Sequence, residues 1–136
     1  MKPYDRTSSH FIKQQQSFSQ LQNTMDDDSM ENREFYQPDL PPFPLNDSKT
    51  ISITKLSPQT SIQTWPPGFQ TGNDVITHTY HEEVYILDGS ITDLSLGQTF
   101  GKGYHAWRNP QMEHGPYQAD DELGCQMIVI IRHEKK

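Results

Sequence analysis

The sequence has little of what a nucleic-acid-binding or membrane-spanning protein needs. It contains 11 Lys and Arg residues against 18 Asp and Glu residues, so its formal net charge is −7. This balance argues against nucleic acid and anionic membranes as partners, because both require a basic face. No segment approaches the roughly 20 apolar residues of a membrane-spanning helix. The first residues, MKPYDRTSSHFIKQQQ, also lack the apolar core of a secretory signal.

Cysteine and hydrophobic residues are scarce as well. Cys125 is the single cysteine, which excludes an internal disulfide and predicts a cytoplasmic location. Hydrophobic residues make up 32% of the chain and are unevenly spread. We therefore predict two regions: an N-terminal arm with a Pro-rich linker over residues 1–47, and a β-barrel over residues 48–134.

The N-terminal region is predicted to be an extended arm without a core of its own. Residues 1–35 are rich in Gln, Ser, Asn and Asp, a composition typical of flexible or partner-packed segments. Four prolines follow in YQPDLPPFPLND, residues 36–47, and indicate an extended linker or an edge strand. The sparse apolar residues of the arm are available to pin it to a neighbouring subunit: Phe11, Phe18, Leu21 and Phe35.

From residue 49 onward, short runs of β-branched and aromatic residues alternate with turn signals, and no amphipathic helix is apparent. About seven strands are predicted, within the segments KTISITKLS, SIQTWPPGFQ, DVITHTY, EEVYILDGS, SITDLSLGQTF, KGYHAWRNP and GCQMIVIIRHE. The Asp-Gly pair in EEVYILDGS is read as a turn. Many short strands at close intervals predict an all-β sandwich or barrel.

Four of the six histidines lie between residues 78 and 114: His78, His81, His105 and His114. Imidazole and carboxylate groups together suit a divalent transition metal, such as Fe(II), Zn, Mn or Ni. A turn is expected near His81, after which the side chains of a strand alternate between its two faces. Glu82 then faces one side with Val84, and Glu83 faces the other.

The segments HEEVYILDGSITD, GKGYHAWRNP and HGPY…GC resemble the cupin superfamily, especially the subgroup of the ChrR anti-sigma cupin domain and acetylacetone-dioxygenase-like proteins. His78, three residues, Glu82, six residues and Gly89 match the second half of the first cupin motif, and the second motif begins at Gly103 and ends at His114. The resemblance implies a double-stranded β-helix, or jelly-roll barrel. It also implies a metal bound by His78, Glu82 and His114.

Two departures from the cupin pattern leave the ligand set open. Ile76 stands where the motif has its first histidine, and Gln111 stands where the second motif has a glycine. His81 is a possible replacement ligand, and Glu83 would replace Glu82 if the turn were one residue longer. The alternatives are an outward Glu83 that pairs with Arg108, and a metal-free cupin with a hydrogen-bonded pocket.

The resemblance implies a metal-dependent enzyme for a small carbonyl- or enolate-type substrate. The chemistry would be dioxygenase-like C–C cleavage or O₂-independent isomerase, cyclase or lyase chemistry. Tyr85, Tyr104 or His81 would then move the proton. The alternative is a non-catalytic cupin that senses a ligand or a metal.

A homodimer is expected, because cupins commonly exchange strands at the barrel edge and KTISITKLS is a suitable donor. Light scattering that gave a monomer mass at every concentration would contradict this expectation.

Overall fold

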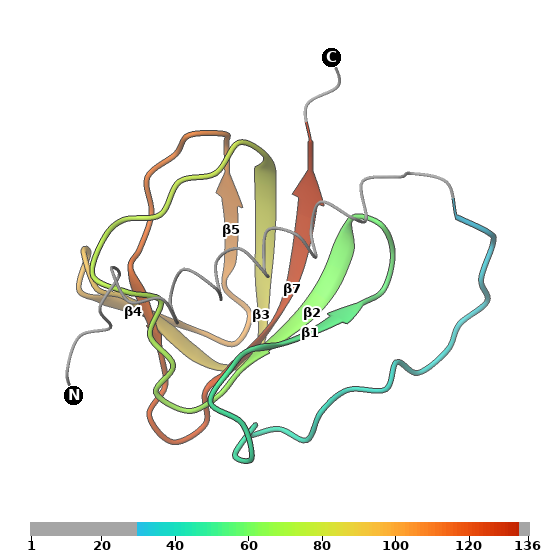
Figure 1. Cartoon of the computed structure of the whole chain (residues 1–136), viewed down its shortest axis with the longest axis horizontal. Helices are drawn as coiled ribbons and strands as arrows, with labels where there is room; N and C mark the ends of the chain where they lie inside the picture. The colour runs from blue at the N-terminus through green and yellow to red at the C-terminus, as the bar shows by residue number, and fades with distance from the viewer. Residues whose placement is uncertain (1–29, 134–136) are drawn as a thin grey trace.

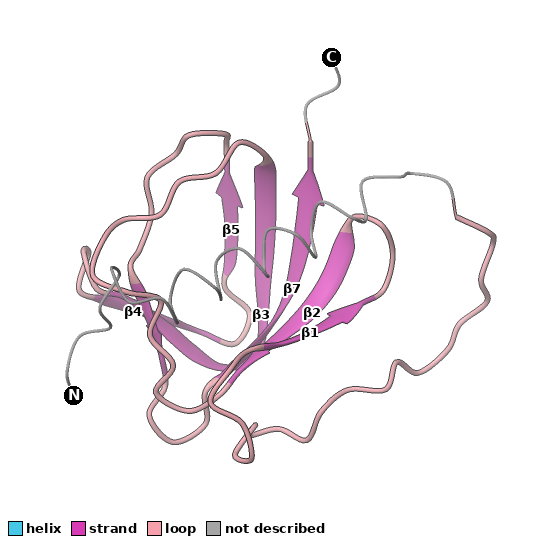
Figure 2. Ribbon diagram, in the orientation of Figure 1, coloured by secondary structure: helices cyan, strands magenta, loops and turns pink. Residues whose placement is uncertain are grey.

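The computed structural model describes residues 30–133, so the predicted arm before residue 30, with Phe11, Phe18 and Leu21, lies outside the described residues. Residues 30–51 form neither helix nor strand and run along the outside of the barrel as a long loop (Figure 2). Phe35 is fully exposed, whereas Leu45 is buried. Within the Pro-rich linker, residues 36–47, Leu45 is thus the apolar residue that is buried.

Seven antiparallel strands form two sheets that share one long strand (Figure 1). They are β1 (Ser52–Lys55), β2 (Thr60–Trp65), β3 (His81–Asp93), β4 (Gln98–Gly101), β5 (His105–Arg108), β6 (Tyr117–Ala119) and β7 (Cys125–Arg132). The first sheet has the order β1-β2-β7-β3-β5, and in the second sheet β4 and β6 both pair with the C-terminal half of β3. This arrangement confirms the all-β prediction.

The core lies between the two sheets and is built by alternation along the strands. On β7, four alternating residues are buried, namely Cys125, Met127, Val129 and Ile131. They pack with Trp65, Ile86, Ile91, Tyr117 and Ala119 from the other strands. GCQMIVIIRHE was predicted as a strand, and the structure shows which of its two faces points to the core.

Strand β3 passes from one sheet to the other through a β-bulge at Leu87, directly before Asp88 and Gly89. Its pairing register with β7 shifts between Ile86 and Asp88, and Gly89 has a positive φ of 72°. The buried positions of β3 are even-numbered before the bulge and odd-numbered after it, as Ile86 and Ile91 show. One extra residue at the bulge thus keeps the apolar side of β3 on the core while the strand bends.

Three local predictions were wrong. The Asp-Gly pair does not form a turn but pairs with β7 directly after the bulge, so two predicted strands form one. DVITHTY forms only a single bridge, Ile76 to His114, and β6 was not predicted. The last two errors fall where pairing is short, because so few residues carry no detectable periodicity.

Gln111, where the second cupin motif has a glycine, retains the backbone conformation that glycine favours. Its φ is 67°, the single positive value at a non-glycine residue among residues 30–133. We expect Gln111→Gly to raise the free energy of unfolding by about 1 kcal/mol, since a left-handed φ costs a side chain about 1–2 kcal/mol. Urea denaturation would measure the change. A lower unfolding free energy for this variant would contradict the expectation.

Over the described range 30–133 there is no helix, and hence none with the length and apolarity to cross a membrane. Strand β1 is the outermost strand of its sheet and pairs on one side with β2. Its other side has no strand neighbour within residues 30–133. The edge that the predicted dimer requires is therefore available in KTISITKLS, and the dimer stays a prediction.

Candidate metal centre

Backbone hydrogen bonds join two loops at one end of the barrel, and this pairing brings two histidines close together. The amide of Ile76 donates to the carbonyl of His114 at 2.6 Å, and the amide of His114 donates to the carbonyl of Ile76 at 3.0 Å. The amide of Gln111 also donates to the carbonyl of His78 at 2.8 Å. These non-local backbone bonds bring positions 78 and 114 side by side without forming a strand.

Glu82 reaches the same place from β3, four residues after His78. It belongs to the inner face of β3, opposite to the face of Glu83, and is 8% exposed. Its Oε1 lies 3.6 Å from Nε2 of His78. One potential ligand atom from each of His78, Glu82 and His114 lies within 4.8 Å of the other two. The structure thus brings together the three residues that the cupin resemblance implied.

The polar groups form a hydrogen-bonded chain that runs through both imidazoles. The carbonyl of Tyr80 can only accept, so Nδ1 of His78 donates to it, at 3.0 Å. When both rings are neutral, Nε2 of His78 then accepts from Nε2 of His114, at 3.1 Å. Nδ1 of His114 in turn accepts from the Tyr117 hydroxyl at 3.0 Å, and that hydroxyl accepts from Nη2 of Arg108 at 2.7 Å.

The electrostatics keep His114 and Glu82 in the protonation states that a metal requires. Burial, together with the nearby charge of Arg108, lowers the pKa of His114 to about 4. Burial alone would raise the pKa of the Glu82 carboxyl, but His78 and Arg108 outweigh this effect and hold the pKa below its usual value. At neutral pH the His114 ring is therefore neutral and Glu82 is a carboxylate.

The three side chains lie in a cavity of about 880 Å³ inside the barrel. Its wall is mainly apolar and comes from both sheets, with Trp65, Phe69, Ile86, Ile91, Phe100, Met127 and Val129 among its residues. Ile76 also lines the cavity, so the position of the missing histidine is apolar. A large apolar space with a few converging polar groups is the usual form of a small-molecule site.

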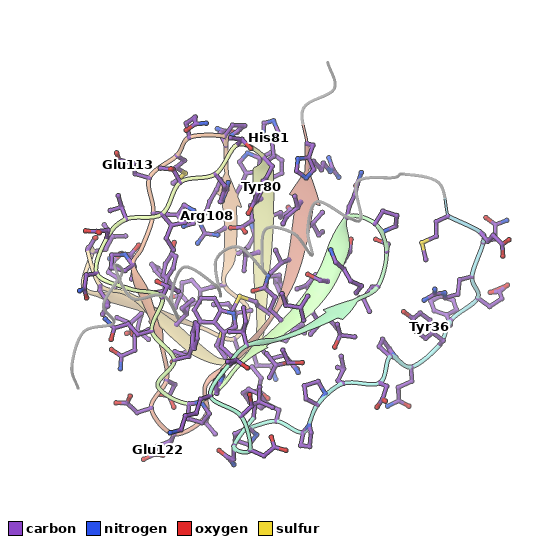
Figure 3. The ribbon with its side chains drawn as sticks, viewed as in Figure 1. Tyr36, Tyr80, His81, Arg108, Glu113 and Glu122 are labelled. Atoms are coloured by element: carbon purple, nitrogen blue, oxygen red, sulfur yellow. The ribbon has the colours of Figure 1, made fainter. Side chains whose placement is uncertain are left out.

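The three residues predicted to move protons lie at different places. His81 is at the rim (Figure 3) and its ring stacks on Trp107, with ring centroids 5.6 Å apart. Tyr85 is on the outer face of β3 and is 45% exposed. Tyr104 is 57% exposed but contributes to the cavity wall. Among these three, only Tyr104 lines the cavity, and their catalytic roles stay predictions.

The predicted pairing of Glu83 with Arg108 is wrong. Oε2 of Glu83 pairs with Nε2 of His105 at 2.7 Å, and Arg108 pairs with Glu82 at 3.1 Å. In the register between β3 and β5, Arg108 lies opposite Glu82, so both point to the inside (Figure 3 shows Arg108 below the rim). Sequence reasoning missed this inward arginine because strand register depends on the tertiary fold.

The donor set fits a divalent transition metal. Two imidazole nitrogens and a carboxylate suit several such ions. His78 donates its Nδ1 proton to the Tyr80 carbonyl, the type of support that orients a metal-binding imidazole. The two Nε2 atoms face each other at 3.1 Å and share one proton, and a metal ion would replace that proton. Each residue keeps an outer hydrogen-bond partner when this happens.

No protein-family model and no curated protein sequence matches the chain. Solved structures do match. An RmlC-like cupin from Shewanella frigidimarina has 10% identity and a TM-score of 0.52, over 80% of this chain and 97% of that chain. A sugar phosphate isomerase of the cupin superfamily from Silicibacter pomeroyi has 14% identity and a TM-score of 0.50, over 62% of this chain and 60% of that chain.

A polyketide cyclase from Streptomyces resistomycificus has 19% identity and a TM-score of 0.45. The match covers 55% of this chain and 54% of the cyclase, so this chain spans about half of the cyclase's length. At these levels of identity the similarities show the fold alone. The chain has a cupin fold, and the predicted double-stranded β-helix is confirmed.

Proposed function

We propose that the protein is a metal-dependent enzyme for a small substrate with a carbonyl or enolate group. One observation carries this proposal: two imidazoles and a buried carboxylate converge in a mainly apolar cavity of about 880 Å³. His78, Glu82 and His114 would hold the metal. When bound, a metal here supplies Lewis-acid chemistry to a carbonyl oxygen.

The protein's own residues provide the surroundings for that chemistry. The apolar wall of both sheets removes water from the substrate, which strengthens electrostatic interactions in the cavity. Tyr104 is the predicted proton-transfer residue that we retain, because it lines the cavity. The resemblance to acetylacetone-dioxygenase-like cupins supports C–C cleavage with Fe(II) and O₂; O₂-independent isomerase, cyclase or lyase chemistry is the alternative.

Elemental analysis of the protein purified without a polyhistidine tag tests the proposal first. We expect close to one equivalent of a transition metal after purification or soaking. Less than about a tenth of an equivalent would contradict the proposal. An oxygen electrode with β-diketone substrates then separates the reactions: O₂ uptake supports cleavage, and substrate loss without O₂ uptake supports isomerase or lyase chemistry. Binding without turnover would instead support the sensing module.

A further inference from the structure

The polar end of the cavity contains a buried arginine whose donors exceed its partners. The Arg108 side chain is 13% exposed, and it is the one Lys or Arg residue in the cavity wall formed by residues 30–133. Its two hydrogen bonds go to Glu82 and to the Tyr117 hydroxyl. A guanidinium has five N–H donors, so these two hydrogen bonds leave most of its donors available to a ligand.

Metal binding by the proposed enzyme would free another donor. His114 would then carry its proton on Nδ1 and donate it to the Tyr117 hydroxyl, 3.0 Å away. That oxygen already accepts from Arg108, so both of its lone pairs would be occupied. The single hydroxyl proton of Tyr117 must then point elsewhere, and Tyr117 lines the cavity.

A third donor lines the cavity from β2. Gln63 on β2 is 2% exposed and lines the cavity. The Trp65 indole, which can only donate, bonds to Oε1 of Gln63 at 3.1 Å and so fixes the orientation of the amide. Nε2 of Gln63 consequently has no partner in the protein. The cavity therefore offers unused donors, and a ligand rich in acceptor oxygens would satisfy them.

Charge leads to the same class of ligand. With neutral imidazoles, the charges of Glu82 and Arg108 cancel, and a divalent metal would add two positive charges. The buried Asp93 accepts hydrogen bonds from the amides of Ser95 and Leu96. When its negative charge is included, the metal-bound site still has a net charge of one positive unit. Glu113 is at the exposed rim (Figure 3), where water screens it. Positive charge in a buried site requires a paired anion.

We propose that the substrate is an oxo acid whose carboxylate is bound by Arg108 and Tyr117 beside the metal, with an apolar body in the barrel. A planar guanidinium matches a carboxylate in shape and donates two parallel hydrogen bonds to it. Gln63 provides a donor for a further oxygen. This inference rests on the proposed metal-dependent function and specifies its substrate class.

The test compares phenylpyruvate with 1-phenylpropan-2-one, which replaces the carboxylate by a methyl group. The full chain is loaded with zinc, its zinc content is measured, and each compound is titrated by calorimetry. We expect the wild type to bind phenylpyruvate at least about tenfold more tightly than the ketone. Arg108→Gln should abolish this preference, and Tyr117→Phe should weaken phenylpyruvate binding by about tenfold with the ketone unchanged.

Two further variants separate a specific effect from a loss of structure. Arg108→Lys keeps the charge without the planar fork and should show an intermediate preference. Arg132→Gln makes the same change as Arg108→Gln at an exposed residue at the end of β7 and should bind both compounds like the wild type. Melting temperatures identify any variant that is unfolded, and the Lys variant then decides the result.

The zinc measurement separates failure of this inference from failure of the proposed function. Zinc-loaded wild type that binds both compounds equally, or neither, overturns the oxo-acid inference and leaves the metal-dependent function standing. The oxo-acid inference is also overturned, with the metal-dependent function left standing, if zinc-loaded Arg108→Gln still binds phenylpyruvate more tightly than the ketone. Wild type that takes up no zinc overturns the proposed function, and the inference falls with it.

Discussion

Replacement of His114 by alanine is expected to weaken zinc binding by about a hundredfold or more. Loss of an outer-shell partner alone typically costs 10- to 100-fold in metal affinity, and the loss of a direct ligand should exceed this. His114 contributes one of two imidazoles within 4.8 Å of the Glu82 carboxylate, so a single imidazole would remain. Competition titration with a zinc-binding dye measures the affinity directly.

Two further variants are measured by the same titration. Glu82→Gln keeps the size of the side chain but removes the charge that attracts the cation, so it should also lose zinc. His81→Ala is the matched control: its ring stacks on Trp107 at the rim, and we expect wild-type affinity. Zinc binding that survives in His114→Ala but disappears in His81→Ala would show that His81 is the second imidazole ligand.

Zinc should also stabilise the wild type against unfolding. At a zinc concentration 100 times the dissociation constant, binding to the folded state adds about 2.7 kcal/mol. The melting temperature of the wild type should therefore rise with zinc, and that of His114→Ala should not. A rise of equal size in both proteins would mean that zinc binds somewhere other than the proposed site.

Gly89→Ala is expected to lower the free energy of unfolding by more than about 3 kcal/mol. A Cβ atom at this position would lie 2.1 Å from the carbonyl oxygen of Gly124 and 3.1 Å from the Cα of Cys125. These are backbone atoms, so β3 or β7 would have to move. The positive φ of 72° adds about 1–2 kcal/mol of strain to any side chain. Urea denaturation measures the loss.

Gly97→Ala separates the two causes of that loss. Gly97 has a similar φ of 65°, but a Cβ atom there would meet nothing within 4 Å. This control should lose only the strain, about 1–2 kcal/mol. If both variants lost the same free energy, the contact with Gly124 would not be significant, and β3 would tolerate a side chain beside the bulge. Loss of zinc binding in Gly89→Ala would additionally show that the bulge positions Glu82.

The strands with clear alternation were predictable, and so were the ligands on them. The segment of β7 was recognisable as a strand because it is a long, strongly apolar run of eight residues. The placement of Glu82 and Glu83 on opposite faces follows from the alternation of side chains along β3. His114 came from the cupin motif rather than from periodicity. By contrast, β6 has three residues, too few for any pattern to appear.

The sequence by itself determined the all-β class and the parity of the long strands, and its cupin motifs implied the three residues that converge. Each of these depends on local alternation or on a motif that lies in continuous stretches of chain. Only the tertiary structure decided that β3 continues through a bulge at Leu87, that Arg108 faces Glu82, and that the Ile76 backbone holds His114 in place. These features depend on which residues of distant strands pair, and loop closure and packing of the whole barrel select that register.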